Sequence, residues 1–368
     1  MSKTRGKIFI VIFMVMIALP YIIWPFISRV VDTTNYEKRQ QAQMPELSMK
    51  NLAAFPKDFE DYVNDNIPFR NQMIGLNSTI RYYLFHTSTS DRVAVGKNGW
   101  LFYTDENDGD PIADYKGQNL LSNEQLNVIA SDLCASRDAL KVQDIDFVIF
   151  IAPNKERIYS NEMPKCYGNP KSEYVAKQIV DYLKENTDLR IVYPIDELTA
   201  AKQGLGDEIN IYHKTDTHWN ELGAYIGTEE LLRELEVNIP EYNSHEIKID
   251  KNDDMPGDMA QMLNMTHTMK AGKTFVPEGY NLHDYTCDDS DVDIIRYHAK
   301  GADSRKLLIE HDSFGNAMAG IIGSQFDECV LIQHEDVYAA IAKEKPDVFV
   351  LETVERYVSS TLSDFEYR

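Results

Sequence analysis

The sequence has only four cysteines, and they are far apart. They are Cys134, Cys166, Cys287 and Cys329. No two of them form the C-x-x-C pair that is typical of structural zinc sites and redox centres, so we expect neither kind of site. Four cysteines allow three disulfide pairings, and the sequence leaves open whether these thiols are bridged or free.

Positive charge is also scarce. The chain has 37 lysine and arginine residues against 59 aspartate and glutamate residues, which gives a formal net charge of −22. Such a chain repels nucleic-acid phosphates, so we expect no nucleic-acid partner. Two acidic clusters, at 105–108 and 288–291, lack the ligand spacing of a calcium loop and are interpreted as solvated surface. The sequence contains no phosphate-binding glycine loop, internal repeat or low-complexity tract.

Only one long hydrophobic run is present, and it lies near the amino terminus. Residues 8–28 carry no charge, and this length exceeds the roughly 18 residues of a membrane-spanning helix. Lys3, Arg5 and Lys7 precede the run, a pattern that places the amino terminus inside the cell and the body outside. A cleaved signal peptide is the alternative. The run is long for one, and no small-x-small cleavage site precedes Arg29, so the pattern favours an uncleaved anchor.

These features predict three parts of the chain. Residues 1–31 form a membrane anchor, made of a short cytoplasmic tail and a transmembrane helix. Residues 32–54 form a polar tether. Residues 55–368 form the folded body, which begins with a region of helical periodicity at 55–85. The protein is therefore expected to be a single-pass protein of the cell membrane with an extracytoplasmic domain.

Strand-like and helix-like segments alternate within the body. Short apolar runs predict strands at 147–152, 189–193, 306–310, 328–332 and 348–351, after a hairpin at 93–103. Helices are predicted at 122–140, 172–184, 220–235, 316–322 and 337–342. This alternation predicts an α/β fold with a mainly parallel sheet flanked by helices. Such sheets bind ligands at the carboxyl ends of their strands, where Asn154 and Ser313 fall.

Two short segments, 216–219 and 312–315, carry the residue types of a nucleophilic site. A serine hydroxyl needs an imidazole to take its proton, and the imidazole needs a carboxylate to fix its tautomer. One residue separates Asp216 from His218, so on an extended backbone their side chains point to the same side. With Ser313 they would supply the orienting acid, the general base and the nucleophile that acyl transfer needs.

The surroundings of Ser313 support this role. The residue lies between a predicted strand and a predicted helix, where free backbone N–H groups at the helix start could bind an oxyanion. Gly315 would let the backbone approach a substrate closely. The alternative is that Asp312 and Ser313 only cap the helix, because both residue types favour that position.

Several segments together carry a family resemblance. They are 212–220, 311–315 and, more loosely, 95–103, 152–155, 346–350 and 355–357. On these segments the chain resembles the alginate O-acetylation family of SGNH-hydrolase-like proteins, and in particular its DHHW-type bacterial branch. The resemblance extends from about Phe55 to Tyr357, which is nearly all of the chain outside the hydrophobic run.

The resemblance implies an SGNH-hydrolase-like fold and an Asp–His–Ser triad carried by Asp216, His218 and Ser313. The acid and base precede the serine, as in the alginate family and unlike ordinary SGNH esterases. Thr217 replaces the first His of the DHHW signature. The triad His is the second, so the chemistry is expected to survive. His311 stands where the commoner nucleophile motif has Gly, which would crowd or tune the site.

Four residues are candidates for contacting the oxyanion or the substrate, namely Gly315, Asn154, Trp219 and Arg356. Asn154 could donate its side-chain amide or be an ordinary turn residue. Trp219 could stack on a sugar, although an aromatic residue beside a helix start is more often part of the core. Arg356 could contact an anionic glycan or form a surface ion pair.

These observations predict an extracytoplasmic O-acetyltransferase that acts on a cell-surface or secreted polysaccharide through an acyl-Ser intermediate. The resemblance implies a membrane-bound O-acyltransferase partner that supplies the acyl group. We expect no cofactor and no metal, because His213 and His218 have no clear third ligand. A carbohydrate esterase with the same triad and a non-catalytic envelope scaffold are the alternatives.

Overall fold

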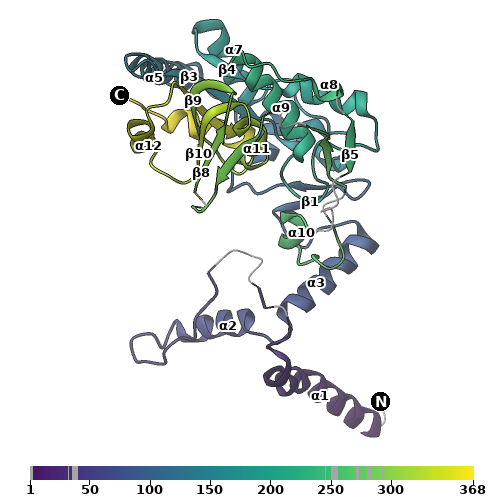
Figure 1. The fold of residues 1–368 in the computed structure, drawn as a ribbon. Helices are drawn as coiled ribbons and strands as arrows, with labels where there is room; N and C mark the ends of the chain where they lie inside the picture. The colour runs from purple at the N-terminus through teal and green to yellow at the C-terminus, as the bar shows by residue number, and fades with distance from the viewer. Residues whose placement is uncertain are drawn as a thin grey trace. The chain divides into compact units, whose positions relative to one another are not determined.

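The computed structural model describes residues 3–31, 33–34, 40–244, 246–249, 256–270, 273–279, 283–291 and 293–368. The chain forms two compact units, both drawn in Figure 1. The first contains Met1–Ser90 and Ala260–Thr268, and the second contains Asp91–Met259 and Met269–Arg368. The boundaries at residues 31 and 54 stay predictions, and residues 32 and 35–39 of the predicted tether lie outside the described residues.

A seven-stranded sheet forms the centre of the second unit. Its order is β4 (Arg190–Val192), β3 (Asp146–Ala152), β11 (Val348–Val354), β9 (Asp303–Glu310), β10 (Phe326–Ile332), β8 (Ile294–Ala299) and β7 (Tyr285–Asp288). The first five strands run parallel. At one edge, β8 pairs antiparallel with β10, and β7 pairs antiparallel with β8. The prediction of a mainly parallel sheet is confirmed, as are the five parallel strands that the apolar runs indicated.

Helices cover both faces of this sheet (Figure 1). Successive side chains of β9 show the division, because Leu308 belongs to one hydrophobic cluster while Leu307 and Ile309 belong to the other. The cluster of Leu308 includes residues of α5 (Asn123–Lys141), α7 (Val175–Asn186), α12 (Val337–Glu344) and α13 (Val358–Asp364). The opposite cluster includes residues of α8 (Ile195–Leu205), α9 (Glu221–Glu234) and α11 (Gly315–Gly323). Both faces are therefore buried, which explains the nearly continuous apolar strands.

Local sequence signals set several element ends. Ser122 and Gln125 form the predicted capping box at the start of α5, and the Asn220 side chain accepts a hydrogen bond at the start of α9. The predicted hairpin is formed by β1 (Val93–Val95) and β2 (Leu101–Tyr103), and its turn contains two residues with positive φ, Asn98 and Gly99.

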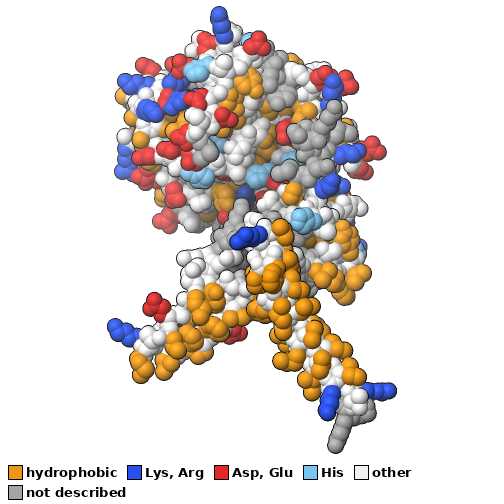
Figure 2. All heavy atoms as spheres, turned by 60° about the horizontal axis from the view of Figure 1, so that its bottom comes forward, with side chains coloured by type: hydrophobic (Ala, Val, Ile, Leu, Met, Phe, Trp, Pro, Cys, Tyr) orange, Lys and Arg blue, Asp and Glu red, His pale blue; other side chains and the backbone are white. Residues whose placement is uncertain are grey.

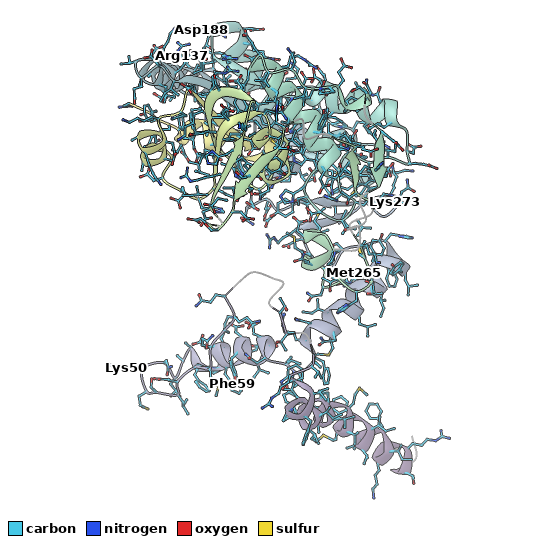
Figure 3. All side chains as sticks on the ribbon, viewed as in Figure 1. Lys50, Phe59, Arg137, Asp188, Met265 and Lys273 are labelled. Carbon is cyan, nitrogen blue, oxygen red and sulfur yellow. The ribbon has the colours of Figure 1, made fainter. Side chains whose placement is uncertain are left out.

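An ion pair on the surface connects two of these elements. The Arg137 guanidinium on α5 pairs with the Asp188 carboxylate just before β4, and Figure 3 labels both side chains. The guanidinium holds the pKa of Asp188 below its ordinary value. The carboxylate is exposed, so the pair contributes little to the free energy of unfolding.

The stretch between α9 and β9 is more ordered than the sequence indicated. No helix or strand was predicted in this polar, methionine-rich stretch. The stretch contains the antiparallel pair β5 (Ile247–Ile249) and β6 (Phe275–Pro277), the short helix α10 (Asp258–Met262), and the edge strands β7 and β8. The signal is weak because β7 is exposed along its whole length, so no apolar alternation marks it. Helix α8 was also not anticipated.

The four cysteines are free thiols in the structure. Cys329 is buried in β10, Cys166 and Cys287 are exposed, and Cys134 is half-buried on α5. Burial raises the pKa of the Cys329 thiol, so this side chain behaves as a small apolar core residue.

The first unit is helical. It contains α1 (Lys3–Ile27), α2 (Phe55–Asp65), α3 (Arg70–Ile80) and a π-helical turn (Arg81–Phe85), which confirms the periodicity at 55–85. Among the described residues, α1 is the one helix long and apolar enough to cross a membrane, a test that a signal sequence also passes. Its apolar side chains are exposed (Figure 2). On α3, a Cβ at Gly75 would lie 2.5 Å from the Asn264 carbonyl oxygen, so the segment after α10 packs closely on this helix.

The central strand offers a test of the core. Phe349 on β11 is fully buried and stacks on Phe147 and Phe365, with ring centroids 5.7 and 5.8 Å away. We expect Phe349→Ala to lower the free energy of unfolding by about 3–5 kcal/mol, because it leaves a cavity in the middle of the sheet. The midpoint of urea denaturation measures the change. Leu120→Ala, at a side chain that is 43% exposed, is the control and should change it by less than about 0.5 kcal/mol. Equal effects of the two variants would contradict this account of the core.

Candidate active site

Three neighbouring parallel strands end at the same edge of the sheet, and each is followed by a predicted site residue. The strands are β3, β11 and β9, which are adjacent in the sheet order. Asn154 follows β3, Arg356 follows β11, and Ser313 follows β9. This is the edge at which the sequence placed the site.

Asp312 shapes the turn that carries Ser313. Its carboxylate accepts hydrogen bonds from the Phe314 N–H at 2.8 Å and from the Val354 N–H at 2.7 Å, so it joins the turn to the end of β11. The backbone N–H of Asp312 donates to the buried carboxyl group of Glu352 at 2.9 Å. Burial and the charge of Asp312 raise the pKa of Glu352 well above its ordinary value, which favours the protonated form of this acid.

The hydroxyl of Ser313 does not cap α11. The helix begins after Phe314, and no side-chain hydrogen bond caps it, so the alternative reading of Ser313 as a cap is wrong. The Oγ atom instead lies 2.7 Å from Nε2 of His218. A residue from the strand-to-helix turn therefore contacts a residue that lies 95 positions away in the sequence.

Asp216 and His218 lie on one tight loop. A bridge between Tyr212 and Trp219 closes the loop. The ring Nδ1 of His218 lies 2.6 Å from Oδ1 of Asp216, and the backbone N–H of His218 donates to the same oxygen at 3.0 Å. When Nδ1–H donates to the carboxylate, the bare Nε2 faces the hydroxyl of Ser313 and can accept its proton. The structure thus brings the three predicted residues together in one hydrogen-bonded chain.

The charge of Asp216 is maintained by its partners. Burial opposes ionisation, but the hydrogen bond from the His218 ring, the charge of that ring and two backbone N–H groups lower the pKa of this carboxyl. An ionised acid here can hold the tautomer of the ring and stabilise the imidazolium that forms during proton transfer.

A buried lysine lies behind the loop. The Lys155 side chain is 1% exposed, and its ammonium donates to the carbonyl oxygens of Asp216 at 2.6 Å and His213 at 3.2 Å. Burial lowers the pKa of Lys155 to about 8. The ammonium also lies over the rings of Trp100 and Phe102, 5.7 and 5.4 Å from their centroids. From the sequence, Lys155 could contact an anionic glycan or form a surface ion pair, and its burial contradicts the surface ion pair.

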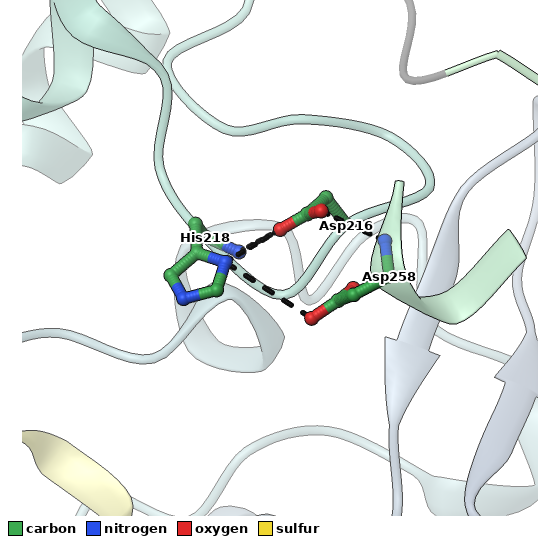
Figure 4. A group of neighbouring side chains, drawn as sticks. All are labelled: Asp216, His218 and Asp258. Atoms are coloured by element: carbon green, nitrogen blue, oxygen red, sulfur yellow. Dashed lines mark hydrogen bonds and ion pairs between the residues drawn. The ribbon is translucent and has the colours of Figure 1, made fainter. Parts of the chain in front are cut away.

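Asp258 contacts the triad loop, although from the sequence the pair Gly257–Asp258 fitted a plain loop better than the rim of a pocket. Its backbone N–H donates to Oδ2 of Asp216 at 2.8 Å, and its carboxylate accepts from the backbone N–H and the hydroxyl of Thr217 at 2.9 and 2.6 Å. Figure 4 shows its Oδ2 beside the His218 ring, 4.0 Å from Nδ1. A usable signal was Gly257. A Cβ there would lie 2.2 Å from the carbonyl oxygen of Thr215, so only glycine allows this approach.

Asp216, His218 and Asp258 also satisfy a distance test for a metal site, because one ligand atom from each lies within 4.8 Å of the others. Their geometry favours hydrogen bonding. The 2.6 Å between His218 Nδ1 and Asp216 Oδ1 is shorter than two ligand atoms keep when each binds an ion at roughly 2.0–2.2 Å in a tetrahedral site. The oxygens of both acids also accept backbone N–H groups.

Two of the oxyanion candidates, Asn154 and Gly315, differ in whether their N–H groups already have a hydrogen-bond acceptor. The side-chain amide of Asn154 is buried, and neither its nitrogen nor its oxygen has a hydrogen-bond partner among the described residues. The backbone N–H of Gly315 donates to the Asp312 carbonyl at 3.2 Å. A Cβ at Gly315 would lie 2.5 Å from the His311 side chain, so the glycine makes room for that buried ring. Asn154 is the freer donor of the two.

Trp219 and Arg356 flank the backbone at Phe314. Trp219 is 1% exposed and donates its indole N–H to the Phe314 carbonyl at 3.0 Å, so it is a core residue with no exposed face for a sugar. The Arg356 guanidinium lies over the Phe314 ring, 5.5 Å from its centroid, and over the ring of Tyr357. Its Nε is buried without a partner among the described residues.

The chain has relatives in one protein family. Residues 93–295, more than half of the chain, match the model of a family described as "SGNH hydrolase-like domain, acetyltransferase AlgX". The match includes Asp216 and His218 and ends before Ser313.

Curated relatives cover part of the chain. It is 27% identical over 175 residues to the "Probable alginate O-acetylase AlgJ" of Pseudomonas syringae pv. tomato, which is 48% of this chain and 41% of that protein. The protein of the same name from Pseudomonas aeruginosa is 26% identical over 178 residues, with the same coverage. The chain therefore matches about two fifths of the length of these relatives.

Solved structures share the fold. Bacillus cereus PatB1 gives a TM-score of 0.53 at 14% identity, covering 75% of this chain and 100% of that chain. A DHHW family protein from Eubacterium siraeum gives a TM-score of 0.51 at 16% identity, covering 75% of this chain and 99% of that chain. At these identities the likeness concerns the fold alone.

The hydrogen-bonded chain predicts an activated serine. We expect a sulfonyl fluoride to modify Ser313, because His218 can take its proton as the hydroxyl attacks the sulfonyl group. His218→Ala should slow the modification by roughly 100-fold or more, the contribution typical of a general base. Mass spectrometry of the peptide that contains Ser313 gives the rate. Ser131→Ala, on the exposed side of α5, is the control and should change nothing. Equally fast labelling of His218→Ala would show that the 2.7 Å contact does not activate the hydroxyl.

Proposed function

Because the chain belongs to the AlgX-type family of SGNH hydrolase-like acetyltransferases, we propose that it transfers an acetyl group to a hydroxyl of a cell-surface or secreted polysaccharide. The observation that carries the proposal is the chain Asp216–His218–Ser313, with contacts of 2.6 and 2.7 Å. These are hydrogen-bond distances at which an imidazole can move a proton to and from a serine hydroxyl.

The first half of the reaction loads the serine. The Ser313 oxygen attacks the carbonyl carbon of an acetyl ester while Nε2 of His218 takes the hydroxyl proton. The tetrahedral intermediate collapses, the donor alcohol leaves with the proton from His218, and the acetyl group remains on Oγ. Asp216 stabilises the imidazolium in both steps, and the hydrogen bonds that hold its carboxylate keep this acid ionised.

The second half transfers the acetyl group. A sugar hydroxyl gives its proton to His218 and attacks the acetyl carbon, and the proton then returns to Ser313 as the new ester leaves. Transfer depends on a sugar hydroxyl reaching the acyl-enzyme before water does. In this proposal the Asn154 amide donates to the oxyanion, since its side chain is buried with no other partner among the described residues.

The names of the relatives support the acceptor, and the donor is part of the proposal. The curated relatives are named as alginate O-acetylases, which supports an exported polysaccharide as the acceptor. In this proposal the Arg356 guanidinium, which lies over the Phe314 ring, contacts an anionic group on such a glycan. The donor acetyl group would come from a membrane-bound O-acyltransferase partner. An uncleaved α1 would hold the body at the outer face of the membrane, close to that supply.

Transfer and hydrolysis make different products from the same acyl-serine. Given an acetyl-ester donor and a glycan acceptor, we expect the purified protein to form acetylated glycan faster than it releases acetate. Without acceptor, an acetyl mass should accumulate on the Ser313 peptide and disappear when acceptor is added. Ser313→Ala and His218→Ala should each lower turnover by orders of magnitude, and the double variant should be little worse than either.

The control for this experiment is Ser131→Ala, which should behave as the unmodified protein. If acetate accounts for all turnover across a range of glycans, and acetylated glycan is stripped, the protein is a carbohydrate esterase. If no acyl-serine forms and the folded triad variants are as active as the parent, the site has no catalytic role and the scaffold alternative holds.

The positive charges in the first turns of α1 predict the topology. Arg5 and Lys7 precede the apolar stretch, so we expect the amino terminus inside the cell and the body outside. Protease added to intact spheroplasts should digest the body and leave a cytoplasmic control protein whole. Mass spectrometry of the purified protein should find the original amino terminus. A body protected from protease, or a mature chain that begins just after Arg29, would contradict the corresponding half of this prediction.

A further inference from the structure

We propose that Asp258 is a positioning residue of the active site, which holds the triad loop through Thr217 and keeps a second negative charge beside His218. The inference rests on the proposed function, because it concerns the same base and nucleophile. Asp258 lies 42 positions after Asp216 and opens the short helix α10. It touches neither Ser313 in the structure nor any reacting atom in the proposed mechanism.

The contacts of Asp258 reach two consecutive residues of the loop. Its backbone N–H donates to Oδ2 of Asp216, and its carboxylate accepts both the N–H and the hydroxyl of Thr217. The first bond fixes the rotation of the Asp216 carboxylate, whose other oxygen then faces Nδ1 of His218 at 2.6 Å. The two bonds to Thr217 fix the backbone on which both triad residues stand. Asp258 therefore holds the Asp216 carboxylate and the loop backbone in the positions that the acid–base pair needs.

The hydroxyl of Thr217 is a hydrogen-bond donor to the carboxylate of Asp258. The residue is 7% exposed, and its hydroxyl donates to Oδ2 of Asp258 while lying 3.3 Å from Nδ1 of His218. A hydroxyl at this position satisfies a carboxylate that is largely removed from water, which would otherwise be costly. Thr217 stands where the DHHW signature has His, and the structure shows that it still supplies a hydrogen-bond donor to the acid.

The charge of Asp258 acts on His218 directly. The titratable and charged groups around the ring are Asp216 from its own loop, Asp258 from α10, Lys155 from α6 (Lys155–Ile158), and Ser313 from the turn before α11. The carboxylate oxygen of Asp258 lies 4.0 Å from Nδ1, so the ionised carboxylate favours the imidazolium that forms when Ser313 loses its proton. Burial and the charge of Asp216 raise the pKa of Asp258, while the Thr217 hydroxyl and the His218 ring oppose that rise. Neutralising this acid makes the ring harder to protonate. The basic form then persists to lower pH, and the acid limb of the activity profile moves down.

A merely structural role would look different. Oδ1 of Asp258 also accepts the N–H of Met259 within α10, so the side chain could serve only to start that helix. Loss of such a helix start would lower stability and activity together. It would leave the pH profile of the remaining activity in place, and it would not depend on the hydroxyl of Thr217.

The test uses the full chain and an acetyl-ester donor. Asp258→Asn keeps the shape of the side chain and removes its charge, while Thr217→Val keeps the shape of the loop residue and removes its donor. We expect each to lower kcat/KM by roughly 10- to 100-fold, the effect of a lost hydrogen bond to a charged group. Thr217→Ser should restore most of the activity. Only Asp258→Asn should move the acid limb of kcat/KM, by roughly one unit to lower pH.

The double variant adds a second measurement. Asp258→Asn combined with Thr217→Val should be little worse than the worse single variant, because both act through one contact. Asp132→Asn, at a half-buried position of α5, removes the same charge outside the site, and it should leave kcat/KM and the profile unchanged. Thermal unfolding should show that every variant compared is folded.

Three results would overturn the inference. The first is an unchanged kcat/KM in folded Asp258→Asn. The second is a loss of activity in Asp258→Asn with an unmoved acid limb, which identifies a helix start only. The third is full activity of Thr217→Val. A failure of the proposed function itself would look different, since Ser313→Ala would then be as active as the parent.

Discussion

The Asp216 carboxylate is half-buried at the tip of a loop, and a carboxylate largely removed from water keeps its charge when hydrogen-bond donors surround it. Three donors do so, namely the ring and backbone N–H of His218 and the backbone N–H of Asp258. Each of these hydrogen bonds requires a particular backbone geometry. The loop has to turn tightly enough for one residue to donate twice, and a distant segment has to approach closely enough to donate once.

Other residues of the site provide this geometry. Gly257 allows the close approach, because any side chain there would collide with the loop backbone. Lys155 holds the loop from within by bonding two of its carbonyl groups. Asp312 fixes the opposite turn to β11 and so sets the position of Ser313. The 2.7 Å contact between His218 and Ser313 therefore joins two turns, and each turn is held by its own hydrogen bonds.

Much of this could be read from the sequence, for physical reasons that also explain the failures. Buried parallel strands are continuous apolar runs, so β3, β9 and β11 were predictable, whereas exposed β7 carries no such pattern. Asp216 and His218 were recognisable because neighbouring residues fix their relation. Asp258 was not, because its relation to Asp216 arises only when the chain folds. For Lys155, the sequence favoured a surface ion pair, and only the folded core shows that the side chain is enclosed.

The two-unit organisation has a practical consequence for anyone who shortens the chain. A soluble fragment starting at Asp91 would keep the whole sheet and every residue of the triad. It would also remove α3, whose Gly75 packs on Asn264. Helix α10 starts with Asp258 in one unit and passes at Ala260 into the other. In the trimmed fragment, the segment Ala260–Thr268 would have lost the helix it packs on, and this segment is continuous with Asp258, which donates a hydrogen bond to Asp216. A loss of activity in that fragment would then reflect the altered position of Asp258 and not a missing partner.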